Sequence, residues 1–153
     1  RGSTTWRTGI IIEEIVDILK FISPSSKLEV RLHPKNNLQQ FNSWKDEITF
    51  DKIRDPLESV WKADYVLGMS SNLLIEAAYL GKNVLSILPR YQEKEWIYEL
   101  KNNMIPSVFT RDKLKKKLEF FNKCKNNLKD NLIIEKSLKE KNEHNINNLI
   151  ISL

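Results

Sequence analysis

The stretch DYVLGMSSNLLIEAAYLGKNVLSILP, residues 64–89, predicts a strand, a tight polar turn, a helix and a second strand. The apolar runs at residues 65–68 and 83–88 are typical of buried strands, and the residues between them have apolar side chains at helical spacing. Ser70 and Ser71 occupy the turn where the first strand passes into the helix. A strand–helix–strand unit of this length indicates two parallel strands joined by a helical crossover.

Elements of the same two kinds precede this unit. Asp55 is a good helix cap and Pro56 suits the first helical position, so a short helix is predicted there. Residues 28, 30 and 32 are apolar and alternate with charged residues, which predicts a strand that ends at His33 and Pro34. The predicted elements are a helix at 10–22, a strand at 27–32, a loop with a short helix at 35–45, a strand at 47–50 and a helix at 55–63.

The chain after residue 90 predicts a helix at 91–103, a short strand at 105–109, and further helices that begin after a capping Thr110 and continue to the end. Strands that alternate with helices favour an α/β fold: a Rossmann-like parallel sheet of about five strands covered by helices on both faces, with a helical C-terminal extension. Crossovers are expected to be right-handed. We expect the α/β domain at residues 1–110 and the extension at residues 111–153.

Composition narrows the class of protein. The chain has 153 residues, a formal net charge of +5 and a single cysteine, Cys124, which favours a reducing, cytoplasmic compartment. It contains no bilayer-length apolar run and no signal-peptide pattern, so a soluble protein is expected. GxGxxG, GxxxxGK[ST], HExxH and paired CxxC motifs are missing, which disfavours dinucleotide, P-loop and metal chemistry. The basic excess permits a nucleic-acid or membrane partner, but a solvated helix face explains it more simply.

Polar residues follow the predicted strands at the edge where parallel sheets bind ligands. His33 and Pro34 end one strand, Ser70 and Ser71 end another, and Pro89 and Arg90 follow the next. The serines lie at a helix N-terminus, whose amides suit a phosphate. Gly68 permits an unusual backbone angle or a close approach. The alternative is that a serine only caps the helix, and that His33 is only a packed residue.

A third polar turn, Gly2, Ser3 and Thr4, stands before the first helix. If a strand preceded it, this turn would also face a phosphate. The sequence begins where such a strand should end, so we expect this chain to be one half of a longer protein.

The RLHPK strand end, the GMSSNLLIEAAYLGKNVLSILP unit and the polar GSTT turn give the chain a family resemblance. It resembles the C-terminal, nucleotide-binding half of GT-B-fold glycosyltransferases. The similarity is greatest to bacterial sialyltransferases and capsule-polymer transferases, which carry an HP motif and an SS motif in this order. The resemblance covers residues 2–109.

The resemblance implies roles for individual residues. His33 of the HP motif, with Pro34, and the serines Ser70 and Ser71 would contact the donor phosphate, and His33 would stabilise it as it leaves. Glu76 occupies the place of a glutamate that binds ribose hydroxyls. The implied partners are a CMP- or UDP-sugar donor, a cell-surface glycan acceptor and the N-terminal half of the same polypeptide. The resemblance implies no cofactor, no metal and no nucleic-acid partner, and it leaves peripheral membrane association open.

The resemblance also implies a catalytic base in the other domain, in an acidic motif that this sequence lacks, so the fragment alone is expected to be inactive. Two relatives remain alternatives. A non-hydrolysing UDP-GlcNAc 2-epimerase has a similar C-terminal pattern, but with further glycine and paired glutamates where this chain has Ser71-Asn72 and Ile75-Glu76. Polymerases of the teichoic-acid type share the SS turn. A non-enzymatic basic module that binds through KLKKK is a further alternative.

Overall fold

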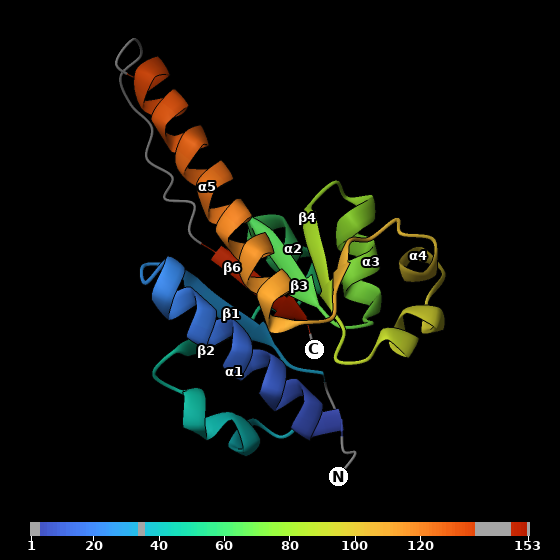
Figure 1. Cartoon of the computed structure of the whole chain (residues 1–153). Coiled ribbons are helices and arrows are strands. Elements are labelled where there is room, and N and C mark those ends of the chain that lie inside the picture. The colour runs from blue at the N-terminus through green and yellow to red at the C-terminus, as the bar shows by residue number, and fades with distance from the viewer. Residues whose placement is uncertain (1–3, 34–35, 137–147, 153) are drawn as a thin grey trace.

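A single all-parallel sheet organises the molecule (Figure 1). The computed structural model describes residues 4–33, 36–136 and 148–152. The strands lie in the order β2-β1-β6-β3-β4-β5, and helices cover both faces of the sheet. The predicted Rossmann-like α/β fold is therefore confirmed.

The bounds of most elements lie close to the predicted ones. The strands are β1 (Lys27–Arg31), β2 (Ile48–Phe50), β3 (Tyr65–Gly68), β4 (Asn83–Ile87), β5 (Ser107–Val108) and β6 (Asn148–Ser152). The α-helices are α1 (Thr4–Ile22), α2 (Pro56–Lys62), α3 (Asn72–Tyr79), α4 (Tyr98–Lys101) and α5 (Arg111–Lys136), and the 3₁₀ helices are η1 (Leu38–Trp44) and η2 (Tyr91–Trp96). No helix in the described ranges has the length and apolar character that crossing a bilayer requires.

Alternation along the strands divides the core into two layers. In β3, Tyr65 and Leu67 pack with α1 and α5 on one face, whereas Val66 packs with α2 and α3 on the other. Because successive side chains of a strand point to opposite faces, a strand buried on both sides needs apolar residues throughout. That requirement explains the uninterrupted apolar run of the opening stretch.

The first helix begins earlier than predicted. We expected it at residue 10, but α1 starts at Thr4 and includes Gly9 in its second turn. A Cβ atom at residue 9 would lie 3.2 Å from the ring of Trp44, so a glycine lets η1 approach the helix closely. The glycine thus serves packing rather than ending the helix, which periodicity alone does not reveal.

The end of the chain differs most from prediction. We expected residues 111–153 to be a helical extension; α5 is helical, and residues 137–147 lie outside the described residues, but residues 148–152 form a sixth strand. This strand, β6, lies in the middle of the sheet, between β1 and β3, and pairs with both in parallel register. Ile150 and Ile151 are 1% and 0% exposed and belong to opposite core layers.

The position of β6 gives the sheet a recognisable order. Counted with β6 first, the strands run 3-2-1-4-5-6, the order of the doubly wound dinucleotide-binding fold. Figure 1 shows that β6 ends at the same edge of the sheet at which α1 begins. The helix therefore lies where a crossover from β6 to β1 would lie, although β6 follows both α1 and β1 in the sequence.

Truncation of a central β6 side chain should destabilise the whole fold. We expect Ile151→Ala to lower the free energy of unfolding by about 2–5 kcal/mol, because the side chain is fully buried in the middle of the sheet. Urea denaturation followed by circular dichroism measures this. Lys116→Ala on the exposed face of α5 is the control and should change stability by less than about 0.5 kcal/mol. Equal stability of the two variants would contradict the central placement of β6.

Candidate functional site

The point between β6 and β3 is where a ligand site is expected. The two strands are neighbours, Gly68 pairs with Ser152, and both strands end at the carboxyl edge. The helix α1 begins at this edge on one face of the sheet, and α3 begins there on the other. In open parallel sheets, ligands bind at the carboxyl edge where neighbouring helices go to opposite faces. The predicted Ser70–Ser71 turn lies at this point.

Ser71 is the N-cap of α3. Its backbone is extended (φ −100°, ψ 146°), and its Oγ accepts a hydrogen bond from the Leu74 amide at 3.2 Å. The alternative noted from the sequence, that a serine caps the helix, is therefore correct for Ser71. A capping serine does not exclude anion binding, because the cap fixes the turn that aims the remaining amides of the helix outward. Ser70 precedes it and is half-buried.

One of the two alternatives predicted for Gly68 can be checked in the structure. It is the last residue of β3 and is buried, whereas the positive φ among the described glycines is at Gly81, with 74°. Gly68 therefore has no positive φ, and the close approach of a ligand there stays a prediction. Beyond it, the Met69 carbonyl accepts a hydrogen bond of 2.7 Å from the hydroxyl of Ser86, which is 0% exposed in β4. This bond ties the serine turn to the neighbouring strand.

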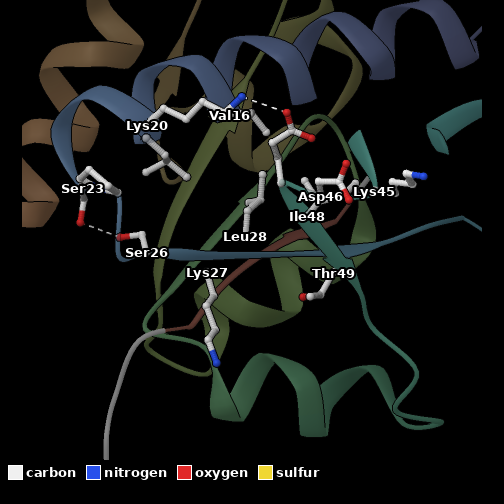
Figure 2. Close-up of a pocket in the computed structure, with 13 residues that line it drawn as sticks. Val16, Lys20, Ser23, Ser26, Lys27, Leu28, Lys45, Asp46, Ile48 and Thr49 are labelled. Carbon is white, nitrogen blue, oxygen red and sulfur yellow. Dashed lines mark hydrogen bonds and ion pairs between the residues drawn. The ribbon is translucent and has the colours of Figure 1, made fainter. Parts of the chain in front are cut away.

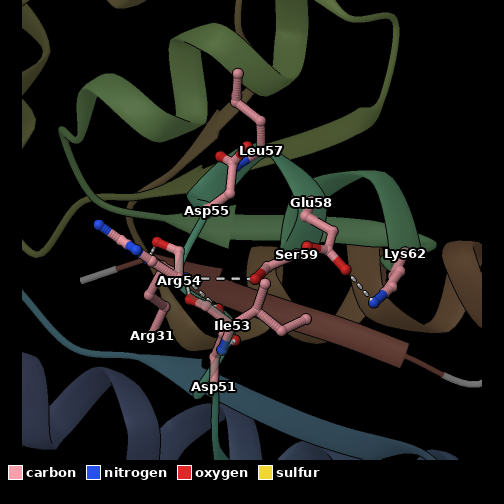
Figure 3. A network of polar contacts seen from close by, with 9 residues as sticks. All are labelled: Arg31, Asp51, Ile53, Arg54, Asp55, Leu57, Glu58, Ser59 and Lys62. Carbon is pink, nitrogen blue, oxygen red and sulfur yellow. Dashed lines mark hydrogen bonds and ion pairs between the residues drawn. The ribbon is translucent and has the colours of Figure 1, made fainter.

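A polar network fixes the end of β1 ahead of His33 (Figure 3). Arg31 Nη1 lies 2.6 Å from Asp51 Oδ2 and donates to the Ile53 carbonyl at 2.9 Å and to the Ser59 hydroxyl at 3.3 Å. The Asp51 side chain is fully buried, and its Oδ1 accepts the Ile53 amide at 2.8 Å. The network joins β1, the end of β2 and α2, so it holds the strand end from which the HP motif departs.

Asp51 stays ionised because this network compensates for its burial. Burial alone would raise the pKa of its carboxyl group, but hydrogen bonds from Ser59 and the Ile53 amide and the Arg31 guanidinium lower it below the usual value. For the neighbouring Glu29, the effects that raise the pKa are larger than the one that lowers it. Its pKa is raised by burial and by the Asp51 charge, against a smaller opposing effect of Lys62.

The other predicted site residues are placed as follows. His33 is exposed at the carboxyl edge, and its carbonyl accepts the Asn36 amide at 2.8 Å. Because β6 separates β1 from β3, His33 follows a strand about 10 Å from the one that leads to the serines. Glu76 is exposed in the second turn of α3. Thr4 begins α1, but its side chain, like Ser3 and Pro34, lies outside the described residues.

The sequence places Arg90 at the same edge, and the structure pairs it with Glu93, which the sequence did not indicate. Arg90 follows β4 and is exposed, and its Nε lies 3.7 Å from Oε1 of Glu93, which is 1% exposed. A buried glutamate three residues after an exposed arginine restrains where the guanidinium can point. The spacing of the two residues could have revealed the pair, but the burial of Glu93 could not be read locally.

A cavity of about 450 Å³ lies at the opposite, amino edge (Figure 2). Leu28 and Ile48 form part of its wall, and Lys20 reaches across to Glu47 at 2.9 Å. None of the residues predicted to bind the donor lines it. The cavity and the predicted site are therefore separate features at opposite edges of the sheet.

Comparison with protein-family models, with curated proteins and with solved structures finds no match to this chain. The function is consequently inferred from the carboxyl edge itself and from the sequence motifs located there.

Loss of the Asp51 carboxylate should destabilise the protein in a pH-dependent way. We expect Asp51→Asn to cost about 2–3 kcal/mol at pH 7, because it leaves the largely buried Arg31 without its counter-charge. Since the folded pKa of Asp51 is lowered, the wild-type advantage is complete above the unfolded pKa, near 4, and is lost as the pH falls through the folded value.

Chemical denaturation between pH 7 and pH 2.5 measures that advantage. Glu58→Gln is the matched control, because the Glu58–Lys62 pair, at 2.6 Å, is exposed and should contribute less than about 0.5 kcal/mol. An Asp51→Asn effect that stayed constant down to pH 2.5 would contradict the ionised, lowered-pKa carboxylate.

Loss of the Ser86 hydroxyl should disturb the serine turn more than the apolar core. We expect Ser86→Ala to cost about 1–2 kcal/mol and to change the amide NMR signals of residues 69–72, because the Met69 carbonyl loses its buried donor. Ser43→Ala, at an exposed position of η1, is the control. Unchanged signals at residues 69–72 would show that the bond does not fix the turn.

Proposed function

We propose that this chain is the donor-nucleotide-binding domain of a bacterial GT-B glycosyltransferase, which moves a sugar from a nucleotide-activated donor to a cell-surface glycan. The observation that carries the proposal is the capped Ser70–Ser71 turn, which leads from β3 into α3 at the switch point beside β6. The same edge carries His33, as the order of the HP and SS motifs implied.

The turn supports recognition of a phosphate. The first amides of a helix lack intrahelical acceptors and carry a partial positive charge of about +0.5, which an anion neutralises. Ser70 and Ser71 add short hydroxyl donors, and the Ser86–Met69 bond holds the backbone that presents them. Preorganised donors of this kind need no rearrangement when a phosphate arrives.

In the proposed reaction, an acceptor hydroxyl oxygen attacks the anomeric carbon as the bond from that carbon to the phosphate oxygen breaks, with inversion. The leaving nucleotide takes the electron pair, and the α3 amides, the two serines and His33 stabilise its growing negative charge. The proton of the acceptor passes to a base in the N-terminal half of the polypeptide. The role of this domain is thus to bind the donor and to stabilise the leaving group.

Two substitutions at Ser71 test the phosphate contact without removing the cap. Asn and Asp both cap helices, but only Asp places a negative charge where the phosphate should bind. We expect Ser71→Asp to retain wild-type stability and to weaken binding of CMP or UDP at least tenfold, and Ser71→Asn to weaken it only a few-fold. Amide NMR titration at millimolar nucleotide measures both the affinity and the site.

In the wild type, the signals of residues 68–72 and of His33 should shift on titration. Undisturbed signals there, or equal nucleotide affinity of Ser71→Asp and the wild type, would exclude a phosphate site at this turn. Thermal melting of both variants confirms that the cap is intact.

A further inference from the structure

An aromatic pair lies at the carboxyl edge, beside the serine turn. Tyr91 opens η2, four residues after Ile87 at the end of β4, and Phe109 follows β5. The ring centroids of the two residues are 5.0 Å apart at 47°, and Tyr91 is 62% exposed while Phe109 is half-buried. Phe109 itself packs against the core layer formed with α3. Tyr91 is therefore supported from one side by the core and open to solvent on the other.

Cations flank this ring. Lys94 Nζ lies over the Tyr91 ring, 5.9 Å from its centroid, and donates to Asn103 Oδ1 at 2.6 Å. Arg90 directly precedes Tyr91, and the buried Glu93 carboxylate is 3.7 Å from its Nε. An exposed ring that is held in place and bordered by fixed positive charge is a suitable stacking surface for a planar group joined to an anion.

The pair is also at a suitable separation from the phosphate turn. β3, β4 and β5 are consecutive neighbours in the sheet, so the end of β3 is about 5 Å from that of β4 and about 10 Å from that of β5. An extended nucleotide has its ribose between base and phosphate, and it can span from the Ser70–Ser71 turn to a ring above β4 and β5. The edge thus offers an anion contact and a flat apolar contact in one line.

We propose that Tyr91, backed by Phe109, stacks on the base of the donor nucleotide, and that Arg90, oriented by Glu93, faces the phosphate next to the ribose. This inference rests on the proposed function, and it names the residues that would make the site bind nucleotides more tightly than simple phosphates. A π face is common to all bases, so the contact selects for the presence of a base and not for its identity.

The test compares ligands with and without a base. Calorimetric titration with cytidine 5′-monophosphate, uridine 5′-monophosphate and ribose 5-phosphate is carried out on the wild type and on Tyr91→Ala, Tyr91→Phe and Tyr98→Ala. Tyr98 is the matched control, because it is 71% exposed on α4. We expect Tyr91→Ala to weaken nucleotide binding about tenfold and to leave the affinity for ribose 5-phosphate unchanged. Tyr91→Phe and Tyr98→Ala should change the affinity for each ligand by less than about twofold.

The outcomes separate this inference from the proposed function. If Tyr91→Ala and the wild type bind nucleotides with equal affinity, the stacking role is overturned and the phosphate site still stands. An equal loss for nucleotides and ribose 5-phosphate also overturns it, because Tyr91 would then act only through the structure of the edge. No binding of any of the three ligands by the wild type overturns both proposals.

Discussion

Two rows of backbone hydrogen bonds, one on each side of β6, hold the sheet together. On one side β6 pairs with β1 from Lys27 to Arg31, and on the other it pairs with β3 from Tyr65 to Gly68. The strands β2 and β1 reach β3, β4 and β5 only through β6. The relative position of the HP and SS motifs depends on this pairing, because a displaced β6 would separate the strands that carry them.

The rest of the candidate site is held by a few individual polar contacts. The cap at Ser71 sets the direction of α3, the Ser86 hydroxyl fixes the Met69 carbonyl, and the Arg31–Asp51 network fixes the end of β1. Each of these contacts can form once the elements that carry its two partners are in place. The edge is thus built by a few buried polar contacts on top of a sheet whose stability comes from its two apolar layers.

Much of this could be predicted from sequence, but only where the cause is local. Asp55 and Pro56 predicted the start of α2, because a cap and a first-turn proline act on the next few residues. The sequence predicts helix for residues 148–152, because the two strands that stabilise them as β6 lie more than 80 residues away and leave no local signal. Burial of Glu93 and of Ser86 depends equally on partners from other elements, which no periodicity reveals.

The position of β6 in the chain also has a kinetic meaning. During synthesis the strands that flank it, β1 and β3, are complete long before residues 148–152 leave the ribosome. Until then, both strands present an unpaired edge to the middle of an unfinished sheet, and such edges readily pair with other chains. Closing contacts across more than a hundred residues is slow. The unfinished sheet is therefore prone to aggregation until residues 148–152 take the central place between β1 and β3.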